Sequence, residues 1–153
     1  MTVLIKRLKT KIPYNTAALK KDALAILRAL GYEDFLISIL VTDNATIQQY
    51  NRDYRDQDKP TDVLSFSFFE GLVPGEKIEP CCDDEKILGD LVISLEYVKE
   101  DAQSWDETFE QRMQTLLVHG MCHLLGYDHE KDEDYEIMHA EEMRLLKTLG
   151  RGI

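Results

Sequence analysis

The residues best suited to chemistry lie in one stretch, 119–129, which reads His-Gly-Met-Cys-His-Leu-Leu-Gly-Tyr-Asp-His. His119 and His123 are four residues apart, a spacing that places both side chains on one face of an α-helix, one turn apart. Gly126 follows, and a glycine there can end the helix in the left-handed conformation. The chain can then fold back so that His129 supplies a third nitrogen, and the spacing therefore predicts a metal site.

Three imidazoles suit zinc, and a site with three protein ligands keeps a fourth position open for water, as catalytic zinc sites do. We therefore predict one Zn²⁺ per chain, held by His119, His123 and His129. Cys122 lies between the ligands and is interpreted as a small buried filler, although a soft thiolate could compete for metal. The fourth histidine, His139, falls in a later charged helical pattern and is interpreted as a surface residue.

The histidine spacing is also that of the metzincin peptidases, His-Glu-x-x-His-x-x-Gly-x-x-His, with one difference. The position of the glutamate that acts as general base is occupied by Gly120. Glycine cannot accept a proton, so the usual peptidase mechanism lacks its base. A close approach to the metal or the substrate is one reason for a glycine here. A metallopeptidase would need another base, for which Glu130 is the candidate.

The composition is that of a soluble globular protein, with 44% hydrophobic and 31% charged residues, and we expect one domain over residues 1–153. No apolar run approaches the ~18 residues of a membrane span. The N-terminus lacks the apolar core and cleavage site of a signal peptide, and three cysteines fit a reducing compartment. These features predict a cytoplasmic protein without membrane attachment.

The charge is unevenly distributed along the chain. The net charge is −11, which argues against phosphate binding. Residues 1–30, however, contain seven basic residues and a single acidic one, Asp22. A local basic face for nucleic acid on an acidic protein is one interpretation, and a merely solvated charged surface is the other.

Hydrophobic periodicity and turn signals predict an α+β (α/β-like) fold in a single domain. Its sheet should be mixed and mostly parallel, with about four strands packed against helices, because some strands are joined through a helix and others only by a loop. An exposed loop is expected over residues 70–86. The expected strands cover residues 3–9, 35–42, 62–68 and 87–94, and the expected helices cover about 16–30, 44–54, 95–103, 107–125 and 132–149.

With the metal motif and its context assembled, the chain resembles the YbeY family of bacterial endoribonucleases. Order and spacing agree over roughly residues 40–130. Ser67 is a departure, since relatives commonly have proline at this position. The blocks that carry the resemblance are NRDYR at 51–55 running into DKPTDVLSF at 58–66, LGDLVIS at 88–94, and HGMCHLLGYDH at 119–129.

The resemblance implies a zinc-dependent, single-strand-specific endoribonuclease that acts in 16S ribosomal RNA 3′-end maturation and ribosome quality control. It also implies the same three zinc ligands, with His119 catalytic as well as metal-binding. The implied partners are ribosomal RNA, the ribosome and possible ribosomal proteins. Two alternatives stay open: a zinc metallopeptidase with an atypical base, and a non-catalytic ribosome-assembly factor with a regulatory zinc.

Arg55 is the second candidate catalytic residue, because a guanidinium grips phosphate oxygens in a fixed geometry. The resemblance points to the same arginine, and the alternative is an exposed salt bridge to Asp53 or Asp58. Lys59 can assist as a point charge or be solvated.

Three aspartates are candidates for supporting roles. Asp62 and Asp90 can orient a histidine ligand or cap a turn. Asp128 can fix its neighbour His129 or hold the turn. Either water or a ribose 2′-hydroxyl could attack the phosphodiester.

Overall fold

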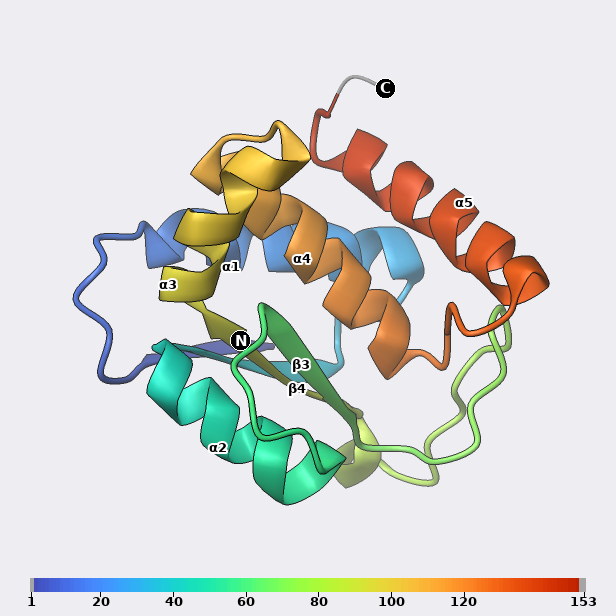
Figure 1. Ribbon diagram of the computed structural model, residues 1–153. Helices are drawn as coiled ribbons and strands as arrows, with labels where there is room; N and C mark the ends of the chain where they lie inside the picture. Colours follow the sequence, from blue (N-terminus) through green and yellow to red (C-terminus); the bar gives the residue numbers. More distant parts are fainter. Residues whose placement is uncertain (1, 152–153) are drawn as a thin grey trace.

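A four-stranded mixed sheet organises the fold in the computed structural model, which describes residues 2–151 (Figure 1). The strand order is β1-β2-β4-β3, with β1, β2 and β4 parallel and β3 antiparallel at the edge beside β4. The predicted α+β fold with a mixed, mostly parallel sheet is therefore confirmed. The strands are β1 (Val3–Arg7), β2 (Leu36–Thr42), β3 (Val63–Ser67) and β4 (Ile87–Ser94).

Helices cover the two faces of the sheet unequally. Helices α1, α3, α4 and α5 lie on one side of the sheet and α2 alone lies on the other (Figure 1). Two short 3₁₀ helices complete the fold, η1 (Asp83–Glu85) and η2 (Ala102–Trp105). The helices are α1 (Thr16–Leu30), α2 (Asn44–Arg55), α3 (Leu95–Asp101), α4 (Phe109–Leu124) and α5 (Asp132–Thr148).

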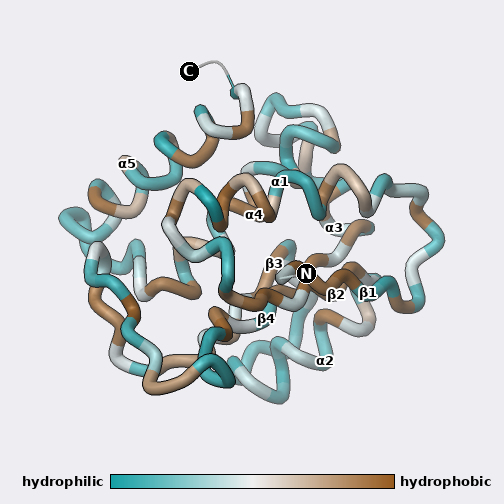
Figure 2. The backbone as a smooth tube through the Cα atoms, turned by 180° about the vertical axis from the view of Figure 1, so that it is seen from behind, coloured by the Kyte–Doolittle hydropathy of each residue, from teal (hydrophilic) through white to brown (hydrophobic). Residues whose placement is uncertain are grey.

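The main core lies between the sheet and the α1/α4 layer. Buried aliphatic side chains of β2 and β4, such as Ile39 and Ile93, meet those of α1 and α4, such as Leu27 and Leu117. These strands form brown, hydrophobic segments in the middle of the backbone in Figure 2. Burial of this apolar surface is the main force that fixes α4, and with it the histidines, against the sheet.

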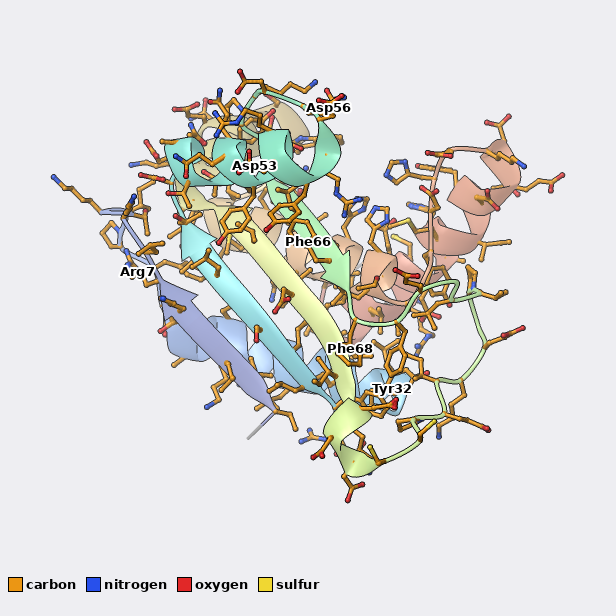
Figure 3. The ribbon with its side chains drawn as sticks, turned by 90° about the horizontal axis from the view of Figure 1, so that it is seen from below. Arg7, Tyr32, Asp53, Asp56, Phe66 and Phe68 are labelled. Carbon is orange, nitrogen blue, oxygen red and sulfur yellow. The ribbon has the colours of Figure 1, made fainter. Side chains whose placement is uncertain are left out.

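The second face of the sheet is covered only in part. Figure 3 looks onto this face, where α2 crosses one end of the strands and Phe66 lies beside it. A small cluster of Ile47, Leu64 and Val92 seals the contact between α2 and the sheet. Because α2 runs across the strands to the β3 edge, its last residue, Arg55, emerges beside that edge strand.

Local sequence signals explain where the helices begin and end. Helix α1 follows Asn15, whose side chain accepts hydrogen bonds from two backbone N–H groups, and Gly31 ends it with φ of 81°. Helix α4 begins at a capping box in which Thr108 and Gln111 satisfy each other's backbone N–H groups. The capping box fixes the start of α4, and packing against the core positions its C-terminal half.

The elements are shorter than predicted at several ends. The strand expected over 3–9 ends at Arg7, because Lys9 adopts a left-handed φ of 61°. The strand expected over 62–68 spans Val63–Ser67, and the helix expected over 95–103 gives way to 3₁₀ geometry after Asp101. The loop 70–86 is not wholly exposed: Ile78 is buried, and its N–H donates to the Tyr32 hydroxyl at 2.9 Å.

None of the helices within residues 2–151 is both long enough and apolar enough to cross a membrane.

Candidate metal centre

Helix α4 presents His119 and His123 on one face, as the four-residue spacing predicts. Their Nε2 atoms lie 3.1 Å apart. The chain then reverses, and the His129 ring stacks beside His119 with 5.4 Å between ring centroids. One ring nitrogen of each histidine lies within 4.8 Å of the others, so the three side chains form a group able to hold one metal ion. The predicted convergence of the three histidines is confirmed.

Gly126 makes the chain reversal possible. Its φ is 93°, and its N–H donates to the carbonyl of His123 at 3.1 Å. A Cβ atom at this position would lie 2.4 Å from the carbonyl oxygen of Leu72. Glycine is therefore required twice, for the left-handed backbone and for the close approach of the 70–86 loop. The predicted helix-ending role is confirmed.

Hydrogen bonds at Nδ1 orient His119 and His123 so that the Nε2 atom of each can bind a cation. The main-chain oxygen of Tyr127 can only accept, so His123 Nδ1, at 2.9 Å, must carry the proton. His119 Nδ1 lies 2.8 Å from a Glu142 carboxylate oxygen and donates in the same way. In neutral rings both Nε2 atoms are then unprotonated, and they face each other. Two opposed lone pairs fit a shared cation.

Electrostatics favour the neutral imidazole of His123. Burial, followed by the neighbouring His119 and His129, lowers the pKa of His123 from 6.5 to about 4. A metal binds the neutral ring, so His123 is ready to coordinate across the physiological pH range without first losing a proton.

Glu142 is the site residue that sequence reasoning missed. It lies on α5, 23 residues after the histidine that it contacts, and no local motif marks it. The proposed orienting role of Asp62 and Asp90 is wrong for the two helical ligands, because Glu142 and Tyr127 already occupy both Nδ1 atoms. Asp62 instead contacts Arg112 at 3.4 Å, and Asp90 lines a groove on the α2 face of the sheet.

Arg55 and the three histidines line the same cleft, which has a volume of about 660 Å³. The Arg55 guanidinium donates to the main-chain oxygen of Ser65 and lies over the Phe66 ring, 5.2 Å from its centroid. In the described part of the chain Arg55 forms no salt bridge with Asp53 or Asp58, so that alternative is wrong. Asp53 pairs with Arg52, and Asp58 accepts from Gln48.

Gly120 faces the sheet rather than the cleft. A Cβ atom there would lie 2.8 Å from a Leu91 methyl group and 3.3 Å from Val63. The close approach that requires a small residue is thus to β4 and β3, and the expectation of an approach to metal or substrate is wrong. A glutamate at 120 would begin in the packed helix–sheet contact, so the position does not suit the base of a metzincin peptidase.

The remaining candidate residues have structural or surface positions. Cys122 is fully buried, which raises the pKa of its thiol and keeps it out of the histidine group, as expected of a filler. His139 is exposed and stacks on Tyr135. Asp128 accepts from the His129 N–H at 2.7 Å and so holds the turn. Lys59 is exposed, and its carbonyl accepts from Asn51.

Glu130 remains near the site as a possible base. It is an exposed residue that lines the same cleft as the histidines.

Comparison with known proteins gives a consistent result. The sequence profile described as Endoribonuclease YbeY matches residues 4–150. Curated relatives named Endoribonuclease YbeY include a human protein, 36% identical over 151 residues that cover 99% of this chain and 90% of the relative. A protein of the same name from Heliobacterium modesticaldum is 42% identical over 137 residues, covering 86% of this chain and 81% of that relative.

The fold also occurs among solved structures. The solution structure of a Thermotoga maritima protein superposes with a TM-score of 0.64 and covers 97% of this chain and 89% of that one. The two sequences are 23% identical, so this likeness supports the arrangement of strands and helices alone.

Proposed function

Because this chain belongs to the endoribonuclease YbeY family, a family of nuclease hydrolases, we propose that it is a zinc-dependent endoribonuclease that cleaves single-stranded RNA. The observation that carries the proposal is one cleft that holds both a three-histidine metal group and an arginine. We further propose that it acts in the cytoplasm on the 3′ end of 16S ribosomal RNA and in ribosome quality control, as the family resemblance implies.

The histidines hold the metal and set its chemistry. When bound, zinc supplies a Lewis acid that polarises a phosphoryl oxygen or a water molecule. His119, His123 and His129 would hold the metal through one ring nitrogen each, and three protein ligands are the number found in catalytic zinc sites. The neutral state of His123, favoured by its low pKa, keeps its Nε2 available as a ligand. His119 serves the reaction as a ligand. Its Nδ1–H donates to Glu142, which leaves Nε2 for the metal.

Arg55 is the phosphate clamp. A guanidinium carries five N–H donors, and those not engaged by the Ser65 carbonyl are free to reach the cleft. The stacking on Phe66 restrains the side chain, so less rotational freedom is lost when phosphate binds. Charge that develops on the non-bridging phosphate oxygens is then stabilised by a group fixed before the reaction begins.

The peptidase alternative lacks a glutamate at the usual position, where a Cβ atom would meet Leu91 and Val63 in the helix–sheet contact. It would have to rely on exposed Glu130. Nuclease and peptidase therefore make opposite predictions for two residues that line the same cleft, and one pair of variants separates them.

Arg55→Ala should lower the rate of RNA cleavage by about a hundredfold, the effect of removing one transition-state charge contact. Zinc content and melting temperature should stay close to those of the unmodified protein, because Arg55 is an exposed non-ligand. Arg52→Ala is the matched control, since Arg52 is an exposed arginine on the same helix that pairs with Asp53. Glu130→Gln should leave RNA cleavage unchanged.

The rates are measured on a labelled single-stranded RNA and, in parallel, on an unstructured peptide. A peptidase would need Glu130 and not Arg55. Wild-type RNA cleavage by Arg55→Ala would rule out the clamp. RNA cleavage that persists after complete metal removal would rule out the zinc-dependent mechanism, and absence of cleavage despite ribosome binding would favour the non-catalytic assembly factor.

A further inference from the structure

We propose that α5 positions the two helical metal ligands through adjacent carboxylates, Glu142 acting directly on His119 and Glu141 acting on His123 through Tyr127. The proposal rests on the metal site proposed above, but it concerns which residues set the affinity of that site. It assigns a function to the C-terminal helix, which contributes no ligand of its own.

Glu142 controls the orientation of His119. Its carboxylate oxygen lies 2.8 Å from Nδ1, and its side chain is only 17% exposed. In that environment the Glu142 carboxylate accepts the Nδ1–H hydrogen bond and fixes the ring with Nε2 turned toward the metal position.

Glu141 acts one step further away. The Tyr127 hydroxyl donates to a Glu141 carboxylate oxygen at 3.0 Å. The main-chain oxygen of the same tyrosine accepts the Nδ1 proton of His123 at 2.9 Å. Tyr127 is 8% exposed and its N–H donates to the Cys122 carbonyl, so the residue is held at three points. The Tyr127 carbonyl is therefore a rigid acceptor for His123. Glu141 is the residue of α5 that helps to hold Tyr127 in place.

Helix α5 is itself firmly attached, which makes it a suitable support. Met138, Leu145 and Leu146 are buried against the main core. Arg144 contacts Glu141 at 2.5 Å and also reaches the Ala29 carbonyl at the end of α1. The two glutamates consequently extend from a packed helix toward α4 rather than from a freely moving one, and the histidine pair is oriented before any metal arrives.

Metal affinity is the first test. Zinc binding by the full chain is measured by competition with a chelator. Glu142→Gln and Glu142→Ala should each weaken zinc binding by about 10- to 100-fold, the usual effect of losing a partner of a metal ligand. Tyr127→Phe keeps the carbonyl but loses the link to Glu141, and should give a smaller loss. Glu136→Gln is the control, because Glu136 is an exposed glutamate on the same helix whose substitution changes the net charge equally.

The second test needs no metal and no activity. In the metal-free protein at about pH 8, above the ordinary imidazole pKa, ¹⁵N NMR distinguishes rings protonated at Nδ1 from rings protonated at Nε2. His119 and His123 should both carry the proton at Nδ1. Glu142→Ala should move the proton of His119 toward Nε2 and leave His123 unchanged. A merely structural role of Glu142 would lower thermal stability without this selective change.

The two tests separate the failure of this proposal from the failure of the proposed zinc site. If the unmodified protein binds no zinc, the zinc site is wrong, while the ¹⁵N experiment still decides the orientation of the rings. If the unmodified protein binds zinc and Glu142→Gln and Glu142→Ala bind it equally well, α5 does not set the affinity. Should Glu142→Ala fail to fold, the near-isosteric Glu142→Gln still provides the comparison of zinc affinity.

Discussion

His123 makes the stability of the metal-free protein depend on pH. Burial and the two neighbouring histidines lower the pKa of its ring to about 4 in the folded state, against 6.5 for an ordinary histidine. Between these two values the unfolded chain binds a proton that the folded chain does not. The contribution of this residue is therefore fully present above about pH 6.5 and is lost as the pH falls toward 4.

The stability of the metal-free protein should therefore fall at acidic pH in a way that depends on His123. Between pH 7 and pH 5, urea unfolding should show a greater loss of stability for the unmodified metal-free protein than for His123→Asn. Asparagine can still donate to the Tyr127 carbonyl but does not titrate. The difference should be on the order of 1 kcal/mol, less than the full shift implies, because the ring is partly exposed and solvent screens it. Parallel pH profiles for the two proteins would contradict the assigned shift.

Individual side chains differ in how far the sequence reveals them. The histidine group follows from local features, namely the four-residue spacing of His119 and His123 on a helix and the helix-ending glycine before His129. Arg55 was found from resemblance and from the chemistry of guanidinium, and the structure adds its contact with Ser65. Glu142 could not be found in this way, because its contact with His119 joins two helices whose packing angle is set by the whole core.

Among the elements, the end of α4 carries the turn that brings His129 to the other two histidines. Two glycines with left-handed backbone provide a matched comparison. At Gly31, after α1, φ is 81° and a Cβ atom would have no neighbour within 4 Å, whereas at Gly126 φ is 93° and Leu72 blocks the space. Both would suffer backbone strain on substitution by alanine, but Gly126 alone would suffer a clash that moves the loop carrying His129.

Gly31→Ala should destabilise the protein by about 1 kcal/mol, the cost of a left-handed alanine, and leave zinc affinity unchanged. Gly126→Ala should destabilise it by more than about 2 kcal/mol and weaken zinc binding. Thermal unfolding of the metal-free proteins and chelator competition provide the two measurements. Equal effects of both substitutions on zinc affinity would show that the Gly126 turn does not position His129.

Element types were predictable, but their spatial order was not. Hydrophobic periodicity and capping residues marked the strands and helices to within a few residues, since these are local preferences. The sequence did not show that β4 lies between β2 and β3, because this order depends on which buried strands pair. Nor did it show that Ser67 donates a hydrogen bond to the Leu124 carbonyl at the end of α4.

Across the molecule, charge and topology bear on how RNA reaches the cleft. The basic N-terminal segment includes β1, which lies at the opposite sheet edge from β3, with β2 and β4 between them. Lys6 and Arg7 on β1 are thus separated by two strands from β3, the strand that borders the histidines. With a net charge of −11, binding of RNA to the free protein should be weak and strongly dependent on salt, and a basic ribosomal partner would offset the repulsion.

One metal ion held by the three histidines should enable this protein to cleave RNA. The most direct measurement is a titration of the metal-free protein with Zn²⁺ while cleavage of a single-stranded RNA is followed. Cleavage should be absent at the start, rise linearly and stop rising at about one zinc per chain, since the described residues contain one group of three histidines able to hold a metal ion. His123→Ala should remain inactive over the same range. Full cleavage by the metal-free protein, or by His123→Ala, would show that RNA cleavage does not need the histidine metal site.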